Sequence, residues 1–183
     1  MALRAGGIIR AEDIRGFSAC QLVETIELDA DESSFVNFTD IPQDGANLWL
    51  IGRVACTVTG FLDVGMRFNA DAGATQYSGF SKRLLADNTT AANWAQSASM
   101  RIATVGDTRR GVMEIMIPRY SATAQKSAYG HGLAVDGVGS AGAMLTYSAG
   151  GAWEGSDPIS QVGIDVFTGS WAASSQFSLY MLF

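Results

Sequence analysis

Few residues in this 183-residue chain have the types and spacing that chemistry requires. His131 is the only histidine, and it lies between two glycines in the stretch YGHGLAV. A Ser-His-Asp or Cys-His nucleophile needs a histidine base held beside the nucleophile. A single glycine-flanked histidine is more typical of a loop or a strand edge, so we expect no catalytic role for His131.

The cysteines and carboxylates do not form a metal or acid–base set. Cys20 and Cys56, with one histidine, lack the ligand spacing of a zinc site, and we interpret both as free, buried small side chains. Glu114 and Asp165 could flank a glycosidic bond, but Glu114 alternates with apolar neighbours like a polar position on a strand. We therefore expect no enzyme, no metal site and no cofactor.

Two tryptophans are the candidate contact residues for a ligand. Trp153 and Trp171 lie in the Gly- and Ser-rich segments GGAWEGSDP and TGSWAAS, which we expect to be loops. An exposed aromatic ring in a loop can stack on a sugar, which makes a glycan the possible ligand. The alternative is that both rings plug the open end of a β-sandwich.

Composition excludes two classes of partner. Charged residues make up 16% of the chain, against about 25% in an average domain, and the net charge is −6. The longest basic run is Arg109-Arg110, so we expect no nucleic-acid partner. No stretch approaches the ~20 apolar residues of a membrane span, and the first apolar run is too short for a signal peptide. We therefore expect no membrane partner and synthesis in the cytoplasm.

The hydrophobic pattern predicts one all-β domain. Short alternating segments, separated by turn residues at about ten-residue spacing, predict about nine or ten strands. This pattern favours an antiparallel β-sandwich, jelly-roll-like, over residues 21–183, with a short N-terminal arm at residues 1–20. Low charge and abundant small residues suit a protein whose surface is covered by other subunits, and they equally suit a Gly-rich all-β domain that stands alone.

Turn chemistry predicts how these strands pair. We expect hairpins around residues 71–73, 106–110 and 168–174, and a weaker pair formed by HGLAVDG and AMLTYSA. Residues 88–100 are rich in Ser and Thr, and a loop is expected there. In the final segment, Phe177, Leu179, Met181 and Phe183 fall on one face of a predicted strand.

The order of the segments resembles a β-rich domain common in virion proteins of tailed bacteriophages. Residues 35–57, FVNFTDIPQDGANLWLIGRVACT, resemble its opening segment F..IPQ.Y..L.L. Residues 66–79 resemble its FNGD...NY hairpin, and residues 169–183 its closing strand, with LYMLF in place of the usual LYGI. The opening MALRAGGIIRAEDI is similar to the N-termini of phage fibre and decoration proteins.

This resemblance implies a structural protein of a phage virion, made in the host cytoplasm and assembling as a homotrimer. The first function that it implies is a capsid decoration (cement or head-fibre) protein, bound to the outer head surface and stabilising it. The alternative is a tail-fibre or receptor-binding domain that contacts host-surface glycans.

The arm would then anchor the protein on the major capsid protein or on tail proteins. The anchoring side chains would be its large aliphatic residues, Leu3, Ile8, Ile9 and Ile14. Ordinary packing of the same residues on the sandwich is the competing interpretation.

Removing residues 1–16 is expected to abolish binding to virions, because it deletes all four aliphatic anchors. The measurement is co-sedimentation of the truncated protein with phage particles, after circular dichroism has shown that it is folded. Binding retained by the folded truncated protein would contradict the anchoring role.

Overall fold

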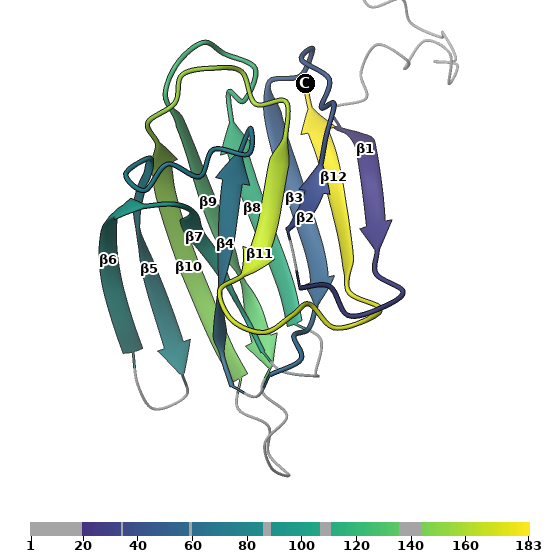
Figure 1. Ribbon diagram of the computed structural model, residues 1–183, viewed down its shortest axis with the longest axis vertical. Coiled ribbons are helices and arrows are strands. Elements are labelled where there is room, and N and C mark those ends of the chain that lie inside the picture. The colour runs from purple at the N-terminus through teal and green to yellow at the C-terminus, as the bar shows by residue number, and fades with distance from the viewer. Residues whose placement is uncertain (1–19, 34, 59, 86–88, 107–110, 136–143) are drawn as a thin grey trace, which may run out of the picture.

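The chain folds into two antiparallel sheets packed face to face, as the computed structural model in Figure 1 shows. The structure describes residues 20–33, 35–58, 60–85, 89–106, 111–135 and 144–183. Within these residues there are twelve strands and no helix. The predicted all-β antiparallel sandwich is therefore confirmed, although it has more strands than expected.

The two sheets differ in width. The larger has eight strands, in the order β1 (Cys20–Glu27), β12 (Gln176–Leu182), β3 (Asn47–Val54), β8 (Gly111–Pro118), β9 (Lys126–Val135), β10 (Met144–Trp153), β5 (Tyr77–Leu85) and β6 (Thr89–Ser97). The smaller has four, in the order β2 (Val36–Phe38), β11 (Val162–Val166), β4 (Leu62–Phe68) and β7 (Met100–Val105). The smaller sheet lies over the middle of one face of the larger (Figure 1).

The chain passes repeatedly from one sheet to the other, as in a jelly roll. Three predicted hairpins are wrong for this reason, because β4 and β5, β7 and β8, and β11 and β12 belong to different sheets. The predicted pairing of β9 with β10 is confirmed. Residues 88–100 are not simply a loop, since β6 pairs there with β5 at the edge of the larger sheet.

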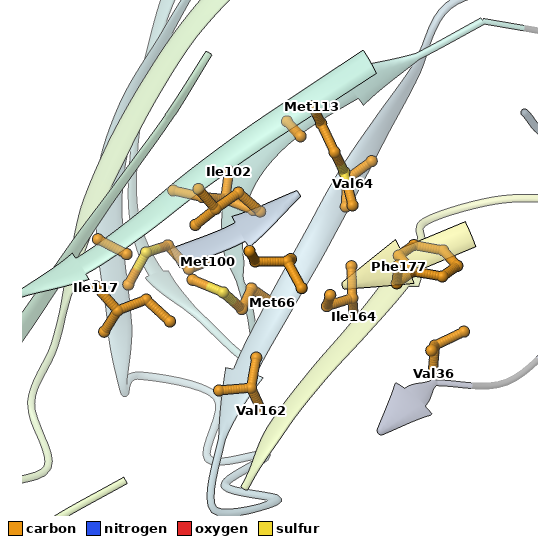
Figure 2. Close-up of a cluster of buried hydrophobic side chains, with 14 of the residues drawn as sticks. Val36, Val64, Met66, Met100, Ile102, Met113, Ile117, Val162, Ile164 and Phe177 are labelled. Atoms are coloured by element: carbon orange, nitrogen blue, oxygen red, sulfur yellow. The ribbon is translucent and has the colours of Figure 1, made fainter. Parts of the chain in front are cut away.

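The core lies between the sheets and follows the period of two. On β12, Phe177, Leu179 and Met181 are buried as predicted, whereas Phe183 lies beyond the strand and is exposed. Figure 2 shows how side chains from both sheets meet, with those of β4, β7 and β11 facing those of β8 and β12. The labelled residues are Val36, Val64, Met66, Met100, Ile102, Met113, Ile117, Val162, Ile164 and Phe177.

The two sheets approach each other closely where β7 lies against β9. After Lys126, the inward residues of β9 are alanine or glycine, and Gly130 leaves room for the backbone of β7. A Cβ atom at Gly130 would lie 2.3 Å from the carbonyl oxygen of Ile102. Since that neighbour is backbone, it cannot turn aside, so the missing side chain sets the spacing between the sheets.

Replacing Gly130 with alanine is expected to lower the free energy of unfolding by about 1–3 kcal/mol, because the added methyl group overpacks the contact with β7. The measurement is urea unfolding. The control is Gly150→Ala on β10, where a Cβ atom would have its nearest neighbour at 3.3 Å. Equal stability of the two variants would contradict the close approach of β7 to β9.

Candidate functional site

The candidate site is the outer face of the larger sheet, the face that the smaller sheet does not cover. Its side chains alternate with the core residues along each strand, yet many are also large and apolar. They are Trp49, Ile51, Phe80, Leu84, Val112, Met116, Tyr129, Leu133, Met144, Tyr180 and Leu182. Their exposed fractions reach 52% at Phe80, Val112 and Tyr129 and 61% at Met144. We call this surface the outer face.

The exposed side of the smaller sheet has the opposite character. Asp63 on β4 forms ion pairs with Arg83 and with Arg101, the latter at 3.2 Å between Oδ2 and Nη1. The guanidinium of Arg67 lies 4.4 Å from the centre of the Phe35 ring. Charged side chains on a solvated sheet face are ordinary, whereas a broad apolar face indicates contact with another molecule.

Glu114 and His131 form a close pair in the middle of the outer face. Glu114 on β8 and His131 on β9 are directly opposite each other in the register, and Oε2 and Nε2 are 2.7 Å apart. Two shallow hollows flank the pair. The larger, of about 510 Å³, is lined in part by Ile51, Val112 and Leu133. The smaller, of about 170 Å³, lies toward the other end of the strands.

The smaller hollow is lined by Trp49, Met116 and Tyr129 together with the ion pair. The ring of Trp49 also packs beside Tyr180, with centroids 5.8 Å apart. Aromatic and long apolar side chains of this kind carry much of the binding energy at protein interfaces.

The lining of the larger hollow includes Tyr147, whose side chain is almost fully buried. Its hydroxyl has no hydrogen-bond partner among the described residues. Burial raises the pKa of this hydroxyl, and the negative charge of Glu114 raises it further. Tyr147 therefore stays neutral, and its hydroxyl is enclosed on the inner side of the sheet, beside Gly132.

The two carboxylates considered for catalysis do not come together. Glu114 is a polar position on an exposed strand face, as predicted. Asp165 lies on β11 of the smaller sheet, so the two carboxylates belong to different sheets and cannot flank one bond. Burial raises the pKa of Asp165. No cluster of three or more metal-ligating side chains occurs in the part of the chain that the structure describes.

The prediction that Trp153 makes surface ligand contacts is wrong. Trp153 is the last residue of β10 and only 3% exposed. Its indole Nε1 donates a hydrogen bond to Oδ2 of Asp71 at 2.8 Å, and its ring meets Phe68 edge-on at 5.6 Å. A ring enclosed in this way has no free face for a sugar.

The prediction that Trp171 contacts a ligand is wrong for the same reason. It is fully buried and meets Phe177 edge-on at 5.0 Å, while its backbone bridges to Glu32 and Cys56. Its indole nitrogen has no hydrogen-bond partner among the described residues. Packing inside the sandwich, the alternative interpretation of these tryptophans, accounts for both positions.

The residues of the FNAD motif hold a connection between the sheets. Asn69 Oδ1 accepts a hydrogen bond from the backbone of Ser160 at 2.8 Å, and its Nδ2 donates one to the carbonyl of Pro158 at 2.9 Å. The Tyr77 hydroxyl donates to the carbonyl of Asp71, and burial raises the pKa of Tyr77 to about 12. Each of these polar groups already has a hydrogen-bond partner within the fold, and these bonds stabilise it.

The remaining predicted residues have mixed outcomes. Cys56 is buried as expected, and its thiol donates a hydrogen bond to the carbonyl of Gly106, but Cys20 is exposed. The anchoring residues of the arm, Leu3, Ile8, Ile9 and Ile14, lie outside the described residues. In the described part of the chain, no helix has the length and hydropathy to cross a membrane.

Sequence reasoning missed the outer face, although a signal was present. On β3, Trp49 and Ile51 are apolar as well as the buried Leu48 and Leu50, so both phases of the alternation are hydrophobic. A strand with two apolar faces is expected to be covered on both sides. The structure adds that, within the described residues, only one of the two sides is covered.

Comparison with known proteins finds no matching family model and no matching curated protein. Among solved structures, the chain is 10% identical to the SPRY domain of human HERC1 (82% of this chain, 96% of that one, TM-score 0.26). It is also 10% identical to peanut lectin (92% and 94%, TM-score 0.23). It is 15% identical to the VP2 subviral particle of infectious bursal disease virus (91% and 42%, TM-score 0.19). With TM-scores this far below 0.5, these likenesses carry no argument about function, and the description of the fold rests on the chain's own sheets.

Replacing each buried tryptophan with phenylalanine is expected to distinguish the contribution of ring packing to stability from that of the indole hydrogen bond. Both exchanges remove the same indole atoms, but only Trp153→Phe also leaves Oδ2 of Asp71 without its donor. Trp153→Phe should therefore lower the free energy of unfolding by about 1–2 kcal/mol more than Trp171→Phe. Chemical denaturation measures both, and a larger loss for Trp171→Phe would contradict this assignment.

Proposed function

We propose that this chain is a structural protein that works as a subunit of a larger assembly, with its outer face covered by protein. The apolar outer face is the observation that carries the proposal. Large side chains such as Phe80, Val112 and Met144 are half exposed or more on a regular strand surface. Transferring such a surface from water into a protein contact is favourable by roughly 25 cal/mol per Å² of apolar area.

The assembly that we propose is the virion of a tailed phage, with the protein decorating and stabilising the outside of the head. The resemblance of residues 35–57, 66–79 and 169–183 to a phage virion domain supports this assignment. So do the low charge and the acidic net charge, which suit contacts with protein rather than with nucleic acid. The arm and the major capsid protein would form the anchoring contact, and no enzymatic activity or cofactor is part of the proposal.

A role in host recognition on the tail is the second candidate. The burial of Trp153 and Trp171 removes the residues to which glycan contact was assigned. One observation still favours a ligand on the other side of the molecule, a polar hollow of about 200 Å³ lined in part by Asn37, Arg67 and Gln161. Amides and a guanidinium can donate hydrogen bonds to sugar hydroxyls.

Antibody–gold labelling of intact phage particles is expected to place gold over the head. The serum is raised against the recombinant chain, and particles incubated with pre-immune serum are the control. Gold confined to the tail tip would favour host recognition instead. No labelling of any particle would contradict a role in the virion.

A further inference from the structure

We propose that a second copy of this chain covers the outer face, with the two larger sheets packed against each other around a two-fold axis. The inference rests on the proposed structural role, because both assign the outer face to contact between proteins. It goes further in naming the partner and the residues that meet. A contact between two identical faces closes after two copies.

The area of the face suits a stable pair. The strands of the larger sheet are seven to ten residues long. With about 4.8 Å between neighbouring strands and about 3.4 Å per residue, the planar area of the eight-stranded face is about 1,000 Å². A standard protein–protein interface buries about 800 Å² on each partner. One identical sheet would therefore cover the face with little left over.

The distribution of charge on the face also suits a second copy. On the three central strands, β8, β9 and β10, the charged groups of the described outer side chains are Glu114 and His131, which are already paired. Arg53 on β3 and Lys82 on β5 lie to either side of these strands. An apolar centre with charge toward the rim is the usual anatomy of an interface.

Net charge favours this face over other parts of the surface. The chain carries a net charge of −6, so two copies repel each other through most of their surfaces. Glu114 is the one acidic residue among the described outward side chains of β12, β3, β8, β9, β10 and β5. Because it is paired with His131, covering the face leaves no carboxylate buried alone.

The relief of the face is complementary to itself under one particular two-fold axis. Along β8 and β9, the register pairs Val112 with Leu133, Glu114 with His131, and Met116 with Tyr129. The larger hollow lies at the Val112 end, and Tyr129 stands 52% exposed at the opposite end. A two-fold axis that runs across the strands at the level of the ion pair exchanges these ends. The ring of Tyr129 in each copy then lies over the larger hollow of the other.

The larger hollow offers apolar walls to a phenol ring. Ile51, Val112 and Leu133 supply these walls. Tyrosine is one of the residues that most often dominate binding energy at interfaces. Tyr129 is therefore the main contact residue of the proposed pair.

Two variants of the full chain test the pairing by sedimentation equilibrium at micromolar concentration. The wild type is expected at twice the mass of one chain. Tyr129→Ala removes the inserted ring, and Thr146→Trp fills the hollow, whose lining includes Thr146. Each should weaken association by at least roughly ten-fold. Phe167→Ala, at a residue 44% exposed just after β11 of the smaller sheet, is the matched control and should leave association unchanged.

Thr146→Trp distinguishes the proposed pairing from non-specific association. It adds apolar surface, so it would strengthen any non-specific contact. Unchanged or tighter association of this variant, a monomeric wild type, or a wild-type trimer would each overturn the proposal. Circular dichroism and thermal unfolding show whether the variants keep the wild-type fold. A monomeric chain that labels virions would overturn the pairing alone, and a dimeric chain that labels no particle would overturn the phage assignment alone.

Discussion

A β-sheet has two faces, and the described strands of this chain cover only one face of the larger sheet. The smaller sheet has half as many strands, and it packs over the inner residues of the larger sheet. The outer residues are nearly as apolar on several strands, because both phases of the alternation carry large hydrophobic side chains. The larger sheet therefore presents more apolar surface than the smaller sheet covers. The proposed assembly would bury the remaining apolar surface.

The close packing between the two sheets explains why the outer face is regular enough to be a binding surface. Small residues on β9 let the backbone of β7 approach until Gly130 lies against the carbonyl of Ile102. Trp153 and Trp171 pack inside the sandwich, and Asn69 and Tyr77 hold the connections. With its inner side packed so closely, the larger sheet presents a stiff outer face. A stiff surface loses little conformational entropy when a partner covers it.

The ion pair between Glu114 and His131 decides what kind of partner the face can accept. An isolated carboxylate in the middle of an apolar surface would resist burial, because its desolvation is costly. With the imidazole opposite it in the register, the carboxylate keeps a hydrogen-bonded partner after water is excluded. We propose no acid–base chemistry with Glu114, because the second carboxylate considered for it, Asp165, belongs to the other sheet.

By itself, the sequence determined the class of the fold and the inward residues of its strands. The period of two is a local property, so Phe177, Leu179 and Met181 of the last strand could be assigned to one face without knowing their neighbours, whereas on β3 both phases are apolar. Strand pairing is not local. A turn has the same kinds of residue whether the next strand pairs with the preceding strand or belongs to the other sheet. For this reason, three connections that were predicted to be hairpins are crossings between the sheets. Burial of Trp153 and Trp171, the place of His131 opposite Glu114, and the uncovered outer face were decided only by the tertiary structure, because each depends on which distant strand lies alongside.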